Sequence, residues 1–177
     1  PTNSIANTDY SANFIDFYNH KQDKQPFCFW YGGYEPHRRY EYGSSLKAGK
    51  KLTDIKTVPP FFPDNDIVRT DILDYALEIE YFDSHVTEIL NFLESKGELD
   101  NTIVIVTSDH GMPFPRVKSD EYEDTNHIPL AVMWGKNIKE PGRIINEYVS
   151  LIDIAPTIFD AVGLDWENSG MHKSPGV

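Results

Sequence analysis

The chain has 177 residues and a formal net charge of −12, and 40% of its residues are hydrophobic. This length and composition predict one domain with a buried core. A strongly acidic chain repels nucleic acid and anionic membrane surfaces, so the charge argues against both as partners. It also repels an anionic substrate, unless a metal ion or a local basic cluster reverses the field.

The first predicted elements are a helix and a buried strand. Asp9 is suited to cap a helix that carries Phe14, Phe17 and Tyr18 on one face. The apolar run from Phe27 to Tyr31 then predicts a buried strand. Its Cys28 is the only cysteine of the sequence, so no intrachain disulfide forms, and we expect a buried core thiol. Residues 34–63 show no period and predict a long loop.

The second half of the sequence predicts an alternation of helices and strands. Apolar residues recur at helical spacing over 65–96, and the β-branched run 102–107 is typical of a parallel strand buried on both faces. A strand is predicted at 129–134, a short strand at 148–151 and a helix at 154–162. The predicted fold class is therefore α/β, with a mostly parallel sheet flanked by helices on both faces.

The strongest chemical motif is Asp109-His110-Gly111, which follows the strand predicted at 102–107. Ligands of parallel α/β sheets bind beyond the carboxyl ends of the strands. The oxygen of Asp109 and the nitrogen of His110 suit a divalent cation, and Gly111 lets the backbone turn sharply beside them. The alternative is a turn-forming aspartate next to a surface histidine.

Two basic loops complete the candidate site. The sequence Glu-Pro-His-Arg-Arg, with His37 and Arg38, follows the first predicted strand and offers donors to an oxyanion. Arg116 and Lys118 follow the metal motif, where a cation stabilises charge that develops on a transferred group. His127 is a further candidate for a ligand or a substrate contact. The alternatives are solvated basic loops and an ordinary capping or core histidine.

Four segments resemble motifs of the sulfatase family, in their order and in their spacing. They are Phe-Trp-Tyr-Gly with Glu-Pro-His-Arg (29–38), the helix Asp-Ile-Val-Arg-Thr-Asp-Ile-Leu-Asp-Tyr with Glu-Tyr-Phe-Asp (66–83), Thr-Ile-Val-Ile-Val-Thr-Ser-Asp-His-Gly-Met-Pro-Phe-Pro (102–115) and Tyr-Val-Ser-Leu-Ile-Asp-Ile-Ala-Pro-Thr (148–157). Within the family, the Pro-Phe-Pro and Pro-His-Arg sequences are most similar to the N-sulfoglucosamine sulfohydrolase branch. The resemblance covers residues 10–165 and implies an alkaline-phosphatase-like fold.

The resemblance also implies roles for individual residues. Asp109 and His110 match two calcium-binding positions, and His37 and Lys118 match residues that contact the sulfate. Arg38, Arg116 and His127 are expected to bind substrate, which would be a sulfated glycan. The family is typical of periplasmic, secreted or lysosomal compartments.

The sulfatase nucleophile is absent from these 177 residues. The family uses a formylglycine made from Cys or Ser in a Cys/Ser-x-Pro/Ala-x-Arg motif, and Cys28 is followed by Phe-Trp-Tyr-Gly instead. Residues 1–177 therefore look like the middle and later part of a sulfatase catalytic domain, with the formylglycine expected upstream. A piece of a domain exposes apolar surface, which predicts self-association.

One departure keeps other functions open. Many sulfatases have Asn at the position of His110, and a nitrogen ligand suits zinc or manganese better than calcium. A metal-dependent phosphodiesterase-like hydrolase of the same superfamily is therefore an alternative. A non-catalytic module that binds glycan or protein is another, because the nucleophile is missing.

Overall fold

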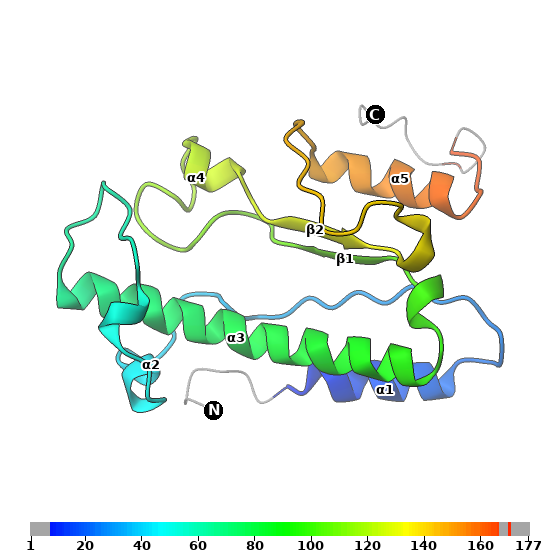
Figure 1. The fold of residues 1–177 in the computed structure, drawn as a ribbon, viewed down its shortest axis with the longest axis horizontal. Coiled ribbons are helices and arrows are strands. Elements are labelled where there is room, and N and C mark those ends of the chain that lie inside the picture. The colour runs from blue at the N-terminus through cyan, green and yellow to red at the C-terminus, as the bar shows by residue number, and fades with distance from the viewer. Residues whose placement is uncertain (1–7, 167–169, 171–177) are drawn as a thin grey trace. The chain divides into compact units, whose positions relative to one another are not determined.

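A computed structural model describes residues 8–166 and residue 170 (Figure 1). The helices are α1 (Tyr10–His20), α2 (Ser44–Lys47), α3 (Asp66–Ser95), α4 (Glu123–Asn126) and α5 (Ile154–Ala161), and the strands are β1 (Val104–Thr107) and β2 (Leu130–Met133). Short 3-10 helices lie at Leu52–Asp54, Leu99–Asn101, Gly135–Asn137 and Leu151–Asp153. The chain forms two compact units, which divide between residues 139 and 140. None of the described helices is both long and apolar enough to cross a membrane.

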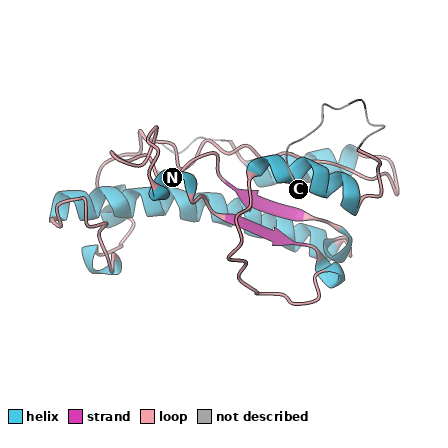
Figure 2. Cartoon of the chain, turned by 90° about the horizontal axis from the view of Figure 1, so that it is seen from above, coloured by secondary structure: helices cyan, strands magenta, loops and turns pink. Residues whose placement is uncertain are grey.

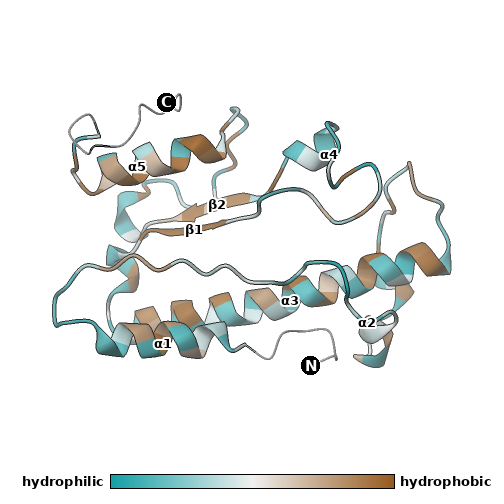
Figure 3. Ribbon diagram, turned by 180° about the vertical axis from the view of Figure 1, so that it is seen from behind, coloured by the Kyte–Doolittle hydropathy of each residue, from teal (hydrophilic) through white to brown (hydrophobic). Residues whose placement is uncertain are grey.

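Helix α1 begins and packs as its sequence predicts. The Asp9 side chain accepts a hydrogen bond from the backbone N–H of Ala12 at 2.8 Å, which caps the helix. Phe14 is buried, and its ring lies edge-on to the rings of Phe29 and Phe92 at centroid distances of 5.0 and 6.0 Å. This aromatic cluster joins α1 to α3, where hydrophobic residues of both helices adjoin (Figure 3).

Helix α3 confirms the long predicted helix, but the face that it buries differs from the predicted apolar stripe. Asn65 caps it by accepting from the backbone N–H of Val68 at 3.0 Å. Ile79, which belongs to the predicted stripe, is 40% exposed, whereas Asp74 and Glu78 are buried. Apolar periodicity missed this face because two of its buried residues are carboxylates, and Asp74 is bound by the loop at 43–45 rather than by water.

An extended segment covers α3 where the sequence predicted a strand. Phe27–Tyr31 forms no strand in the described structure, and the chain from Tyr31 to Arg38 instead runs antiparallel along α3 (Figure 1). The Tyr31 ring stacks on Phe82 at 4.9 Å. The Arg38 guanidinium donates two hydrogen bonds to the Asp71 carboxylate at 3.0 and 2.8 Å. The buried thiol predicted at Cys28 is also wrong, because that residue is exposed.

The two described strands pair antiparallel, with Val104 opposite Met133 and Thr107 opposite Leu130 (Figure 2). The predicted parallel sheet is therefore not confirmed within residues 8–166. β1 is only half-buried and β2 is mostly exposed, so the predicted burial of β1 on both faces is not observed. A β-branched run indicates extended backbone, but it does not encode the direction of the partner strand.

The second unit contains α5 and the turn before it. The strand predicted at 148–151 is wrong, because a 3-10 helix occupies Leu151–Asp153. The Asp153 carboxylate accepts from the backbone N–H of Ser150 at 2.7 Å and makes no side-chain cap to α5. The predicted helix itself is confirmed as Ile154–Ala161.

Candidate functional site

Arg38 connects the two loops that the sequence predicted to form one site. Its Nε donates to the carbonyl oxygen of Pro113 at 2.9 Å, and its guanidinium lies 4.7 Å from the centroid of the Phe114 ring. Arg38 follows His37 directly, and Pro113 is three residues after His110. The histidine loop and the metal-motif loop, 75 residues apart in sequence, therefore lie against each other.

The same contacts determine which N–H donors of Arg38 are available to a substrate. Three of its N–H groups donate to protein oxygens of Asp71 and Pro113. The hydrogen bonds that Arg38 donates to Asp71 raise the pKa of its guanidinium, so its charge is permanent. A substrate contact of Arg38 stays a prediction, and only the remaining donors of the guanidinium would serve it.

His37 sits on a short turn beside this junction. Its backbone N–H donates to the carbonyl oxygen of Tyr34 at 2.9 Å, and its side chain is exposed. The ring Nδ1 lies 2.9 Å from the carbonyl oxygen of Arg38. Because a carbonyl only accepts, Nδ1 carries the hydrogen and Nε2 is the atom available to a ligand.

Asp109 and His110 provide two donors at suitable spacing for one cation. His110 Nδ1 lies 2.6 Å from the carbonyl oxygen of Gly111, which leaves Nε2 with its lone pair. That Nε2 is 3.8 Å from Asp109 Oδ2. Because metal–ligand distances are about 2–2.6 Å, one divalent cation could contact both atoms. The described residues contain no group of three or more His, Cys, Asp or Glu side chains arranged for a metal, so these two form at most part of a coordination shell.

Gly111 is required by a close approach. A Cβ at Gly111 would lie 2.0 Å from the carbonyl oxygen of Asp124 and 2.7 Å from Val117 Cγ1. The Gly111 N–H donates to the carbonyl oxygen of Thr125 at 3.0 Å, which ties the metal motif to α4. The sequence predicted a glycine with unusual backbone freedom here, but the structure uses its lack of a side chain.

We expect the substitution Gly111→Ala to destabilise the chain by about 2 kcal/mol, because the added methyl overlaps backbone that cannot move aside cheaply. Chemical denaturation monitored by circular dichroism measures this loss. Gly32→Ala is the matched control, since its added methyl meets only the Trp30 side chain, at 3.2 Å. Equal unfolding free energies for Gly111→Ala and the unsubstituted chain would contradict the predicted clash.

Two buried residues hold the basic loop that carries Lys118. Phe114 and Val117 are buried, and Thr125 Oγ1 donates to the Val117 carbonyl. Lys118 is exposed directly beside this anchor. Arg116 differs from it, because its guanidinium lies 4.8 and 5.5 Å from the ring centroids of Tyr122 and Phe61. Lys118 is therefore the freer cation of the two for an anionic group.

His127 lies at the end of α4 on the surface. Its Nδ1 is 3.3 Å from Glu123 Oε1, and both side chains are largely exposed. No contact in the described structure joins it to His37 or to the metal motif. Its role as a substrate contact stays a prediction.

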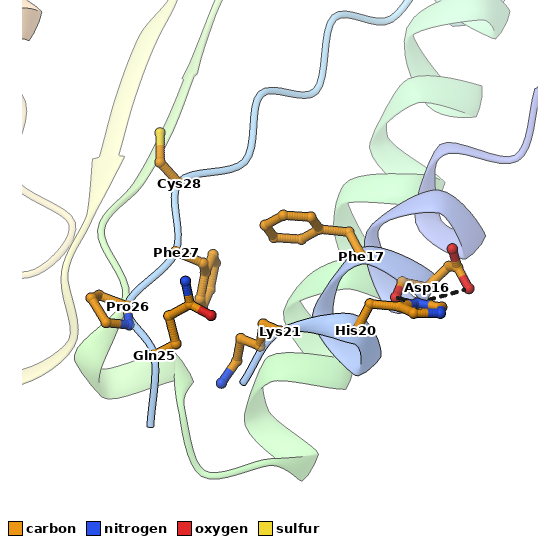
Figure 4. Close-up of a pocket in the computed structure, with 8 residues that line it drawn as sticks. All are labelled: Asp16, Phe17, His20, Lys21, Gln25, Pro26, Phe27 and Cys28. Atoms are coloured by element: carbon orange, nitrogen blue, oxygen red, sulfur yellow. Dashed lines mark hydrogen bonds and ion pairs between the residues drawn. The ribbon is translucent and has the colours of Figure 1, made fainter. Parts of the chain in front are cut away.

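One pocket of the first unit lies away from these residues. Its volume is about 570 Å³, and it is lined by residues of α1 and of the segment 25–28, among them Phe17, Lys21 and Phe27 (Figure 4). None of the predicted site residues lines it. His20 in this pocket pairs with Asp16 on its own helix, at 3.5 Å.

Sequence reasoning missed the carboxylates of α3 that support the site. Asp71 binds Arg38, while Asp74 and Glu78 are buried beneath the loops. Their spacing of three and four residues places them on one face of the helix. Acidic residues at this spacing, between Thr70 and Phe82, were the signal that could have found them.

A family model described as Sulfatase matches residues 3–164. This is most of the sequence, and the chain therefore belongs to the sulfatase family, whose fold is α/β of the alkaline-phosphatase type. Among curated proteins, it is 30% identical to human "N-sulphoglucosamine sulphohydrolase" over 176 residues, which is 88% of this chain and 35% of that protein.

Two bacterial relatives extend the comparison. The chain is 31% identical over 133 residues to an "Ulvan-active sulfatase" of Formosa agariphila, which is 69% of this chain and 22% of that protein. It is 34% identical over 96 residues to an "N-acetylglucosamine-6-O-sulfatase" of Bacteroides thetaiotaomicron, which is 52% of this chain and 17% of that protein. The chain thus spans about a third or less of the length of these relatives.

Proposed function

We propose that the full protein that contains this chain hydrolyses a sulfate ester or a sulfamate on a sulfated sugar. Residues 1–177 would supply part of its metal and sulfate sites, as the middle and later part of the catalytic domain. The observation that carries the proposal is the hydrogen bond from Arg38 to Pro113, because it joins the loop of His37 to the loop between His110 and Lys118.

In this proposal, the basic residues contact the sulfuryl group, and Asp109 and His110 bind the metal. His37 Nε2, when protonated, and the Lys118 ammonium would donate to the sulfuryl oxygens, on which negative charge grows during transfer. Asp109 and His110 would hold a divalent metal, which we propose to be Ca²⁺. When bound, this metal supplies positive charge for the nucleophile and the sulfuryl group. The formylglycine nucleophile would come from outside these 177 residues.

We further propose that the preferred substrate carries an N-sulfated glucosamine. The Pro-Phe-Pro and Pro-His-Arg sequences support this preference. So does the 30% identity over 176 residues to a relative that is named for that substrate. The nitrogen ligand of His110 favours the alternative, a phosphodiesterase-like hydrolase that uses zinc or manganese.

Metal removal and a choice of substrates test the proposal in the full protein. We expect hydrolysis of N-sulfoglucosamine to be lost on chelation and restored by Ca²⁺, with little hydrolysis of a phosphodiester such as bis(4-nitrophenyl) phosphate. Released sulfate and 4-nitrophenol are the two readouts. Restoration by Zn²⁺ together with phosphodiester turnover would favour the alternative, and undiminished desulfation after full metal removal would reject the metal role.

A further inference from the structure

Glu78 is a buried carboxyl in the middle of α3, and no basic side chain of the described structure forms an ion pair with it. Its residue is 2% exposed, and its Oε1 has no hydrogen-bond partner among the described residues. Asp74, one turn earlier on the same face, is also buried but is fully engaged by the loop at 43–45. An ionised carboxylate oxygen without a donor is costly away from water, so Oε1 of Glu78 needs either a proton or a partner.

The segment facing Glu78 is the one that carries His37. Gly33 approaches α3 so closely that a Cβ there would lie 3.3 Å from the Phe82 ring, one turn after Glu78. Glu35 follows on this segment and is 5% exposed. It lies within the turn that the His37 N–H closes on the Tyr34 carbonyl. The carboxyl of Glu35 is thus two residues from the proposed sulfate-binding histidine.

The charges around Glu78 favour its protonated form. Burial, followed by the negative charges of Glu35 and Asp74, raises the pKa of Glu78 to about 7. The titratable groups that face it in the described structure are Asp74 and Tyr81 on α3 and Glu35 on the opposing segment. Asp74 already accepts four hydrogen bonds. Glu35 is the carboxylate near Glu78 on the opposing segment, and its oxygens can accept a hydrogen bond from the protonated carboxyl of Glu78.

We propose that Glu78 is a positioning residue for His37: its protonated carboxyl donates a hydrogen bond to the Glu35 carboxylate and holds the turn Tyr34–His37 against α3. The functional meaning of this clamp rests on the proposed sulfate-binding role of His37, but the clamp itself is a property of the chain alone.

The clamp has a defined direction with pH. The pKa of Glu78 is raised from its ordinary value near 4.5 to about 7 in the folded chain. The proton is therefore held below about pH 7 and lost as the pH rises through that value, and the clamp is lost with it. Packing alone would give a turn whose order does not change over this range.

Hydrogen exchange at the backbone amide of His37 tests the proposal without substrate or metal. We measure by NMR the protection of this amide, corrected for intrinsic exchange and divided by that of the Lys96 amide at the end of α3. In the unsubstituted chain, we expect at least fivefold higher relative protection at pH 5.5 than at pH 8.5. Equal values at the two pH values would overturn the clamp.

Variants of Glu78 separate the proton from the shape of the side chain. Glu78→Gln keeps an N–H donor at every pH, so we expect protection that is high at both pH values. Glu78→Leu has no donor, and we expect protection that is low at both. Glu94→Gln, an exposed residue of α3, is the control and should behave as the unsubstituted chain. Protection of His37 in Glu78→Leu equal to that of the unsubstituted chain at pH 5.5 would reject the proposal.

These outcomes are independent of the proposed activity. A pH-dependent clamp in a protein that hydrolyses no sulfate would leave the inference standing and reject the function. A sulfatase whose His37 amide exchanges equally at both pH values would do the reverse.

Discussion

Replacing Lys118 or His37 by alanine should lower kcat/KM for sulfate release by about 100-fold or more in the full protein. Each side chain is exposed beside a buried anchor and is placed to donate to an oxyanion. Removing one such donor from an oxyanion site costs about 2.7–4 kcal/mol of transition-state stabilisation. Steady-state kinetics with a sulfated glucosamine measure the loss.

Two control substitutions test whether the loss of activity is specific to the proposed sulfate site. Lys21→Ala removes a cation of the same kind just after α1 and should leave kcat/KM unchanged. Arg116→Ala should have a smaller effect than Lys118→Ala, because the guanidinium of Arg116 lies against the Tyr122 and Phe61 rings. A Lys118→Ala enzyme with full activity would remove Lys118 from the sulfate site.

Replacing Asp74 by alanine should cause the largest loss of stability among the substitutions considered. Its carboxylate accepts from the backbone N–H groups of Gly43 and Ser45 at 2.7 and 2.8 Å, and from the hydroxyls of Ser44 and Ser45 at 3.3 and 2.5 Å. All these contacts are buried or partly buried. Hydrogen bonds to a charged group contribute about 1.5–3 kcal/mol each, and a donor left unsatisfied adds its own cost.

We therefore expect Asp74→Ala to lower the free energy of unfolding by at least 3 kcal/mol, measured by chemical denaturation. Asp74→Asn should lose less, because its amide oxygen still accepts while its NH₂ group opposes the loop donors. Asp83→Ala, on the exposed face of the same helix, should change the value by under about 0.5 kcal/mol. A loss for Asp74→Ala no larger than for Asp83→Ala would show that the loop at 43–45 does not depend on this carboxylate.

The helices were predictable because the residues that cap their ends are close to those ends in the sequence. Asp9 and Asn65 cap α1 and α3 with hydrogen bonds that span three residues, and Gly97 follows α3 with a positive φ of 69°. The strands were predictable in position but not in pairing. The run at 102–107 predicts extended backbone, whereas its antiparallel partner depends on how residues 108–129 return the chain.

The candidate site was predictable in its motifs but not in its support. His37, Asp109, His110 and Lys118 lie next to elements that the sequence identifies. The contacts that hold their loops are long-range: Arg38 reaches both Asp71 and Pro113. The residues next to Arg38 in the sequence do not indicate such a contact, and an arginine at this position is equally consistent with a substrate ligand. The apolar run Phe27–Tyr31 is ambiguous in the same way, because its residues can pack against a helix as well as they can pack within a sheet.

The contacts of Tyr31 and Arg38 with α3, at the two ends of the segment that they bound, restrict where the chain tolerates insertions. Tyr31 contacts α3 at Phe82 and His85, and Arg38 contacts it at Asp71. The fourteen helical residues between these contacts span about 21 Å. The chain from Tyr31 to Arg38 bridges them with the turn Tyr34–His37 in between. The contacts on α3 thus fix how many residues the chain can have between Tyr31 and Arg38. Adding or removing one residue between 32 and 37 would shift His37 by about 3.3 Å, far beyond the roughly 0.5 Å that a catalytic contact tolerates.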